Sequence, residues 1–250
     1  MVSLLTKGQV CGSYEHPSWQ RVVFAEFEST LTSKSRPFPC VFGVSGLKGD
    51  QLRYSFLDPL EPETVAPVLA EYLAGARDIG RMTSLVVFGR PGPVQGIEAY
   101  RDRFWSILDG LSALDEGPQP EGVSRDLDDP TWEFTFAGEP VFVVCNSPAH
   151  VMRQSRRSTS FMITFQPRWV FDGITDSDDP AVKKALKIVR DRIREFDAIE
   201  ESPFLGSYGQ FENREYQQYF LDDTNEAPRC PFHQLGRRLV ETPEKEGKVA

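Results

Sequence analysis

Apolar residues recur at intervals of three and four along four stretches of the chain, the period of an α-helix with one buried face. In the clearest stretch Tyr100, Phe104 and Leu108 would share that face. Ser18 and either Asp178 or Asp179 stand just before two of the stretches and are residue types that cap helix N-termini. The pattern therefore predicts helices over residues 19–31, 63–79, 97–114 and 180–199.

Shorter apolar runs predict strands. In residues 52–57 the side chains of Leu52, Tyr54 and Phe56 alternate with others, which is typical of a half-buried strand. Similar runs predict strands at residues 40–44, 84–88, 132–136, 141–145 and 161–165. Glycines separate the runs at residues 40–44 and 52–57, so residues 40–57 are expected to form a hairpin. Residues 115–130 are polar and are expected to be a surface loop.

The order of these elements predicts the fold class. Strands and helices do not alternate strictly, which favours an α+β fold over a doubly wound parallel sheet. We expect a single domain over residues 1–240, with a mixed, mostly antiparallel sheet of about six strands and about four helices. Residues 241–250 are charged and are expected to be a flexible tail.

Composition narrows the class of protein further. The formal net charge of -9 argues against general binding to nucleic acid, which leaves a basic footprint. No apolar run approaches the ~20 residues that span a bilayer, and the N-terminus lacks a secretory pattern. The cysteines are widely spaced and form no CxxC pair, which favours reduced thiols and a cytoplasmic location. They are Cys11, Cys40, Cys145 and Cys230.

Residues 141–171 contain no acidic residue, although the chain as a whole is acidic. They carry His150, Arg153, Arg156, Arg157 and Arg168. Guanidinium groups suit bidentate recognition of carboxylate or phosphate, and an imidazole can ligate iron or transfer a proton near pH 7. The alternatives are a hydrogen-bonded structural histidine and a basic face paired with acids from elsewhere in the chain.

Other motifs are weaker. No phosphate-binding loop, nucleophile elbow or HExxH helix occurs. Cys40, Cys230 and His233 could each ligate a metal, although a free cysteine is more often a small buried apolar residue. Trp169 could line a cofactor or belong to the core.

Several short motifs taken in order resemble the YqcI/YcgG family. They are FPCVFG at residues 38–43, NSPAH at 146–150, FQPRWVF at 165–171, YFLD at 219–222 and RCPF at 229–232. The resemblance covers about residues 35–235. Characterised relatives include haem-dependent N-oxygenases, such as the arginine N-hydroxylase of D-cycloserine biosynthesis and the guanitoxin pathway enzyme. This chain departs from the branch that has His-Pro before Ser-Ser-Arg, since its histidine stands in Ser-Pro-Ala-His150.

The resemblance implies a protein that binds haem b and oxygenates a nitrogen of a small amine, amino acid or guanidine compound. It would use O2 or peroxide, with a possible electron donor. We expect His150 to be the catalytic iron ligand, with Cys230, Cys40 and His233 as alternatives. The expected propionate partners are Arg153, Arg156, Arg157 and Arg168, with Trp169 against the porphyrin.

Two other hypotheses remain. The first is a non-enzymatic protein that carries or senses haem or an anionic metabolite. The second is a haem-free protein whose basic loop binds a phosphate or carboxylate metabolite.

Overall fold

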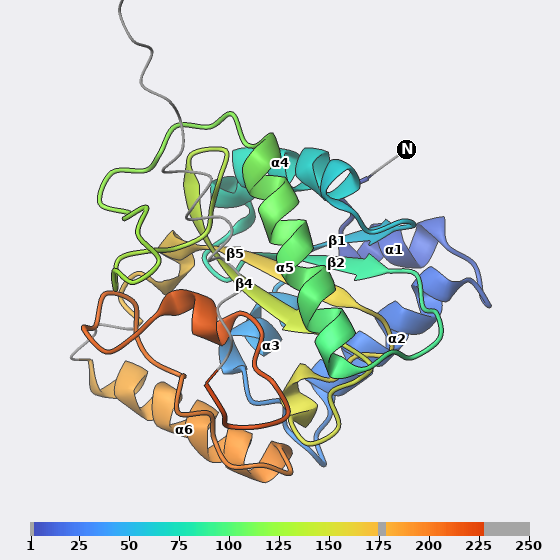
Figure 1. The fold of residues 1–250 in the computed structure, drawn as a ribbon. Helices are drawn as coiled ribbons and strands as arrows, with labels where there is room; N and C mark the ends of the chain where they lie inside the picture. The colour runs from blue at the N-terminus through green and yellow to red at the C-terminus, as the bar shows by residue number, and fades with distance from the viewer. Residues whose placement is uncertain (1–2, 175–178, 228–250) are drawn as a thin grey trace, which may run out of the picture.

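A five-stranded mixed sheet lies at the centre of the computed structural model, which describes residues 3–174 and 179–227 (Figure 1). The strand order is β1-β2-β5-β4-β3. β1 and β2 pair in parallel, and the other three pairings are antiparallel. The predicted α+β class with a mostly antiparallel sheet is therefore confirmed. The strands are β1 (Leu52–Leu57), β2 (Ser84–Gly89), β3 (Thr135–Phe136), β4 (Glu139–Asn146) and β5 (Met162–Pro167).

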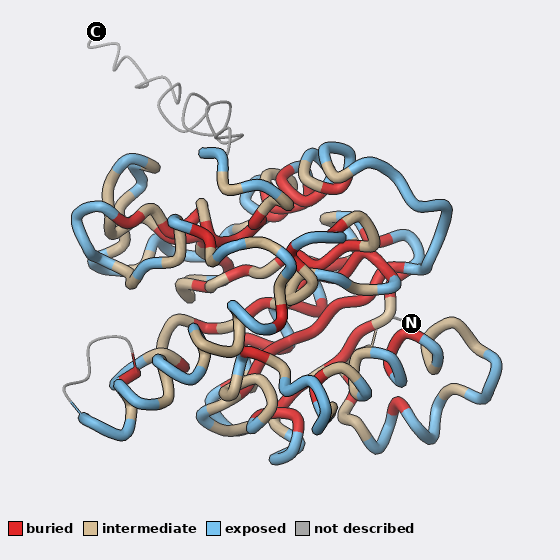
Figure 2. The backbone as a smooth tube through the Cα atoms, turned by 90° about the horizontal axis from the view of Figure 1, so that it is seen from below, coloured by how far each residue is buried: buried red, intermediate tan, exposed pale blue. Residues whose placement is uncertain are grey.

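Helices cover both faces of the sheet, and the buried residues concentrate along the strands between them (Figure 2). On one face α4 (Pro62–Ile79) and α5 (Ile97–Leu114) pack against β1, β2, β5 and β4. The other face packs against α1 (Lys7–Ser13), α2 (Trp19–Thr32) and α3 (Val41–Lys48). A sixth helix, α6 (Pro180–Phe196), lies at the edge of the molecule (Figure 1).

The predicted helices form where the apolar period placed them. Tyr100, Phe104 and Leu108 are all buried on α5. Ser18 caps α2 and Asp179 caps α6 through side-chain oxygens that accept backbone N–H groups. No helix in the described ranges combines the length and the apolar character needed to cross a membrane.

The expected hairpin over residues 40–57 is wrong. Residues 41–48 form α3, with the Cys40 thiol accepting the Gly43 N–H at 3.3 Å as its cap. A Cβ at Gly46 would lie 2.4 Å from the Met82 carbonyl oxygen, so this glycine lets the helix pack directly against the backbone before β2. β1 consequently pairs with β2, in parallel, with α4 as the crossover.

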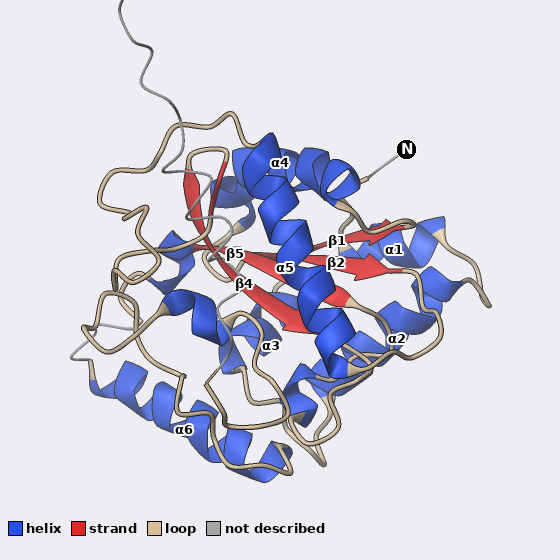
Figure 3. Cartoon of the chain, viewed as in Figure 1, coloured by secondary structure: helices blue, strands red, loops and turns tan. Residues whose placement is uncertain are grey.

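Other boundaries also differ. Within residues 132–136 only Thr135–Phe136 is a strand, because the preceding residues are held by a loop contact between Ser124 and Trp132. The apolar period also missed two short helices, α1, which has a capping box of Thr6 and Gln9, and α3, which Cys40 caps. α6 ends at Phe196 rather than at residue 199. Much of the chain outside the sheet and the helices is loop, stabilised by the short 3-10 turns η1 (Gln154–Arg156), η2 (Arg168–Phe171) and η3 (Glu215–Gln218) (Figure 3).

The α3 face of the sheet is covered unevenly. Over β1 and β2 its side chains are buried, as at Tyr54 and Val86. Along the same row, Thr164 of β5 and its partner Val144 of β4 are only half-buried. Phe142 and Gln166 form the next such pair. The helices of this layer therefore leave the β4–β5 half of the face partly open.

The close approach of α3 predicts opposite effects for two glycine substitutions. Gly46→Ala should lower the free energy of unfolding by about 1–3 kcal/mol, because the new methyl group collides with the Met82 carbonyl oxygen. Gly75→Ala in α4 meets no atom within 4 Å and should raise it by about 0.5–1 kcal/mol. Urea denaturation measures both. A Gly46→Ala protein as stable as the wild type would contradict the packing described.

Candidate functional site

The loop between β4 and β5, residues 147–161, binds a carboxylate that belongs to the chain itself. The backbone N–H groups of Val151 and Met152 donate to Oδ2 of Asp223 at 2.7 and 3.0 Å, and that of Arg153 donates to Oδ1 at 2.8 Å. Burial opposes ionisation of Asp223, but these three donors outweigh it and hold the pKa below its usual range. These backbone donors thus bind an aspartate of the chain itself, Asp223.

His150 is buried at the base of this loop, and both of its ring nitrogens are hydrogen-bonded. Nε2 donates to the Leu221 carbonyl oxygen at 3.0 Å, since a carbonyl can only accept. Nδ1 then accepts the Ser147 hydroxyl at 2.9 Å. Burial lowers the pKa of His150, which favours this neutral form. In this arrangement neither nitrogen is free to bind iron.

Arg153 is also buried and ties down the same C-terminal segment. Its Nε donates to the Asp222 carbonyl oxygen at 2.8 Å, and its Nη2 donates to Oδ1 of Asn225 at 2.8 Å. Asp222 forms a further ion pair with Arg101 of α5 at 2.7 Å. Residues 221–225 are thus held against the β4–β5 loop by side chains that the sequence analysis assigned to a ligand.

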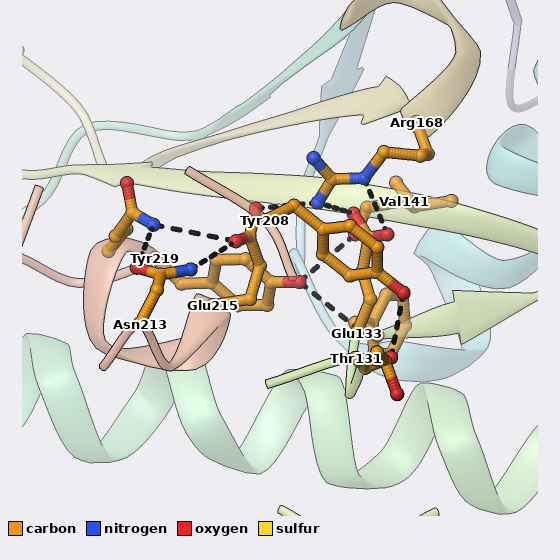
Figure 4. Close-up of polar contacts among 10 residues, drawn as sticks. Thr131, Glu133, Val141, Arg168, Tyr208, Asn213, Glu215 and Tyr219 are labelled. Carbon is orange, nitrogen blue, oxygen red and sulfur yellow. Dashed lines mark hydrogen bonds and ion pairs between the residues drawn. The ribbon is translucent and has the colours of Figure 1, made fainter. Parts of the chain in front are cut away.

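Arg168 lies in a separate buried cluster (Figure 4). It binds both oxygens of Glu133 at 2.7 and 2.5 Å and one oxygen of Glu215 at 2.6 Å. The Tyr208 ring stacks on its guanidinium group with 4.1 Å to the centroid. Burial, together with the repulsion from Glu215, raises the pKa of Glu133 to about 7 against the attraction of Arg168. This cluster joins η2, η3 and the segment before β3.

The other expected cofactor contacts are also engaged. Trp169 is half-buried and packs under Arg77, whose guanidinium carbon lies 5.0 Å from its ring. Arg157 is exposed and donates to the His150 carbonyl oxygen at 3.2 Å. One alternative was that arginines of this segment pair with acids from elsewhere in the chain. Arg168 does so, with Glu133 and Glu215.

The side chains of Arg156 and Cys40 are partly or fully accessible to solvent. Arg156 is half-buried in η1, and Cys40 is exposed at the N-terminus of α3. Both have pKa shifts dominated by burial, which lowers the pKa of Arg156 to about 10 and raises that of Cys40. Each group is among the causes of the other's pKa shift, so the thiol and the guanidinium group lie near each other.

The turn η1, which carries Arg156, is anchored to the end of β4. Nδ2 of Asn146 donates to the Ser155 carbonyl oxygen at 3.3 Å, which fixes η1 beside this strand. Asn146 points to the same face as Val144, because side chains alternate along a strand. We take Cys40 and Arg156 as the candidate functional groups and call them the Cys40–Arg156 pair.

Some expected ligands lie elsewhere. Cys230 and His233 fall outside the described residues, as does the tail at 241–250. In residues 3–174 and 179–227, no group of three or more histidine, cysteine or acidic side chains is placed to hold a metal ion. A haem iron needs only one protein ligand, so this finding bears only on metal sites with three or more such protein ligands.

Sequence reasoning missed the acids that organise this region. Asp223, Glu133, Glu215 and Asp197 had no motif to distinguish them among the 37 acidic residues. One signal was present in the sequence, the basic segment 141–171 that contains no acid. If such a segment is buried, its arginines need acidic partners from elsewhere in the chain.

The raised pKa of Glu133 predicts a pH dependence. The native state binds its proton up to about pH 7, whereas the unfolded carboxyl releases it near its model value of 4.5. Its contribution to stability is therefore full below pH 4.5 and is lost as the pH rises through 7. Between pH 4.5 and 7 the free energy of unfolding of the wild type should fall by about 2–3 kcal/mol relative to that of Glu133→Gln, as measured by urea denaturation. A difference in free energy of unfolding between the two proteins that stays constant with pH would contradict this expectation.

The buried contacts of His150 predict a structural effect. His150→Ala removes partners from the Ser147 hydroxyl and the Leu221 carbonyl oxygen, so the free energy of unfolding should fall by about 2–4 kcal/mol. His16→Ala is the matched control, since His16 is exposed, and should change it by less than about 0.5 kcal/mol. Equal stability of the two variants would argue that His150 is not held as described.

Comparison with known proteins adds an independent finding. The YqcI/YcgG family model matches residues 27–233. The chain is 42% identical over 230 residues to "Uncharacterized protein YcgG" of Bacillus subtilis (strain 168), covering 88% of this chain and 90% of that protein. It is 39% identical over 228 residues to "Uncharacterized protein YqcI" of the same organism, covering 88% and 89%.

A third relative has a named activity. The chain is 31% identical over 226 residues to "Putative N(omega)-hydroxy-L-arginine synthase DcsA" of Streptomyces lavendulae, covering 86% of this chain and 84% of that protein. No solved structure matches the chain. Because the family model and all three relatives span most of the sequence, the chain belongs to the YqcI/YcgG family.

Proposed function

We propose that this protein is an N-oxygenase that acts on a nitrogen of a small amine, amino acid or guanidine compound, with haem b as its cofactor. The observation that carries the proposal is the 31% identity to the arginine N-hydroxylating relative over 86% of the chain. The two relatives of higher identity carry no named activity, so the substrate is proposed as a class.

The residues first expected to hold a haem do not fit that role. His150 and Arg153 are buried and hydrogen-bonded to the 221–225 segment, and Arg168 is paired with two glutamates. Releasing any of them would leave buried polar groups without partners, at about 1–3 kcal/mol each and more for charged groups. We therefore place no cofactor contact on these three side chains.

Cys40 of the Cys40–Arg156 pair fits better. It is exposed, so a haem could reach it without releasing a buried ion pair. Desolvation by the surrounding protein raises the pKa of this thiol, while the Gly43 N–H and the positive charge of Arg156 oppose that shift and favour a thiolate. Thiolate sulfur is an established axial ligand of haem iron. Cys40 is thus the proposed iron ligand among the described candidates.

When bound, the haem would supply the iron that activates oxygen or peroxide for transfer of one oxygen atom to a substrate nitrogen. The chain would contribute the thiolate ligand at Cys40 and the positive charge of Arg156 near it.

The absorption spectrum tests the cofactor and its ligand together. Protein produced with haem supply should show a Soret band with the features of thiolate ligation. Cys40→Ser should lose those features, whereas Cys11→Ser should keep them, because Cys11 is an exposed thiol on α1. His150→Ala should be less stable but spectrally similar.

Each negative result has a defined meaning. Absence of a Soret band after haem titration would refute the cofactor, and an unchanged spectrum of Cys40→Ser would refute the ligand. N-Hydroxylated product, detected by mass spectrometry with an electron source or peroxide, tests the reaction itself.

A non-enzymatic binding protein is the second candidate, favoured by one observation. Arg156 has a partly exposed guanidinium group, which would suffice to bind an anionic metabolite without oxygen chemistry. Ligand binding without turnover under any oxidant would support this alternative.

A further inference from the structure

The Glu133–Arg168–Glu215 cluster places two carboxylates on one guanidinium group, and all three are withdrawn from water (Figure 4). The side chain of Glu133 has no exposed surface, that of Glu215 is 3% exposed and that of Arg168 is 17% exposed. With both carboxylates ionised, the cluster would hold one uncompensated negative charge in the interior. Such a charge is costly, and the smallest group that removes it is a proton.

The hydrogen bonds indicate which carboxylate takes this proton. Oε2 of Glu215 accepts from the side-chain amides of Asn213 and Gln218, at 3.1 and 3.4 Å. Its Oε1 accepts from Arg168 at 2.6 Å, so three residues stabilise its ionised form. Glu133 has Arg168 as its one side-chain donor in the described part of the chain. Glu133 is therefore the carboxyl that binds the proton, in agreement with its pKa of about 7.

The other titratable side chains that face Glu133 are two tyrosines. Tyr208 stacks on the guanidinium group of Arg168, and the Tyr219 hydroxyl is hydrogen-bonded to the backbone beside the sheet. Burial raises the pKa of Tyr208 to about 12 and that of Tyr219 well above its usual value. Both phenols consequently stay neutral near pH 7, and their charge does not change in the range where Glu133 titrates.

The cluster also attaches one segment of the chain to the sheet. Residues 208–218 supply Tyr208 and Glu215, whereas Glu133 precedes β3 and Arg168 follows β5. The middle of this segment, residues 209–212, is exposed. Its attachment therefore depends on contacts near its two ends, and both Tyr208 at one end and Glu215 towards the other bind Arg168.

We infer that the cluster is a proton-controlled latch, which holds residues 208–218 against the sheet while Glu133 is protonated and loosens when Glu133 loses the proton. In the open state Glu133 is solvated and ionises near 4.5, whereas in the closed state it keeps its proton up to about pH 7. Opening therefore releases one proton between these values. The equilibrium constant for opening should rise by about tenfold per pH unit inside this window and level off above it.

Hydrogen–deuterium exchange of the full chain measures this opening. After correction for the intrinsic exchange rate, peptides from residues 208–218 should show an opening constant that rises about 30–70-fold between about pH 5 and about pH 8. Peptides from α5 report global unfolding, and their opening constant should be lower at every pH. Equal constants in the two regions would mean that the segment opens only when the whole protein unfolds, which would overturn the inference.

Two variants remove the excess charge in different ways. Glu133→Gln keeps the shape of the side chain and cannot ionise, so the opening constant of residues 208–218 should no longer depend on pH. Glu215→Gln leaves Glu133 and Arg168 as a neutral pair, which should lower the pKa of Glu133 and move the pH dependence out of this window.

Glu139→Gln is the matched control, because Glu139 is a partly exposed acid that pairs with Arg77 at the surface. It should keep the pH dependence of the wild type. An opening constant of the wild type that is the same at about pH 5 and about pH 8, or a pH dependence that survives Glu133→Gln, would overturn the latch. Infrared spectroscopy gives a second readout, since the absorption of a protonated carboxyl near neutral pH should be present in the wild type and absent from Glu133→Gln.

Discussion

The capture of residues 221–225 by the β4–β5 loop is the interaction on which the rest of this region depends. Three backbone N–H groups bind the Asp223 carboxylate, while His150 and Arg153 bind the carbonyl oxygens of Leu221 and Asp222. His150, Arg153 and Leu221 are buried and Asp223 is partly buried, so their partners are costly to remove. The loop in turn fixes η1, which carries Arg156.

The same constraint determines which polar side chains hold the fold together and which remain available for binding. Residues that looked like ligands are consumed in holding two distant segments together, since a buried histidine or arginine must be hydrogen-bonded somewhere. Arg168 shows this most clearly, with a glutamate on each side and Tyr208 over its face (Figure 4). Cys40 is exposed and Arg156 is half-buried, so the Cys40–Arg156 pair remains accessible.

Much of the fold was predictable from local pattern, and the site was predictable only in part. The apolar period located α2, α4, α5 and α6, because burying one helical face requires that period wherever the helix packs. It failed at residues 40–44, where an apolar run too short to show a period became the start of α3. Cys40 and Arg156 were among the expected site residues, but nothing local distinguished them from His150 or Arg168.

The sequence by itself determined the class of fold, the family and the basic, acid-free segment that organises the site. These properties depend on the types and order of the residues and not on the contacts that the chain makes when folded. The tertiary structure alone decided which arginines of this segment are paired within the described part of the chain. That choice depends on where Asp223, Glu133 and Glu215 arrive from more than 30 residues away, and a pairing across such distances leaves no periodic trace in the sequence. Burial then makes each pairing obligatory, because an unpaired charge in the interior is far costlier than one in water.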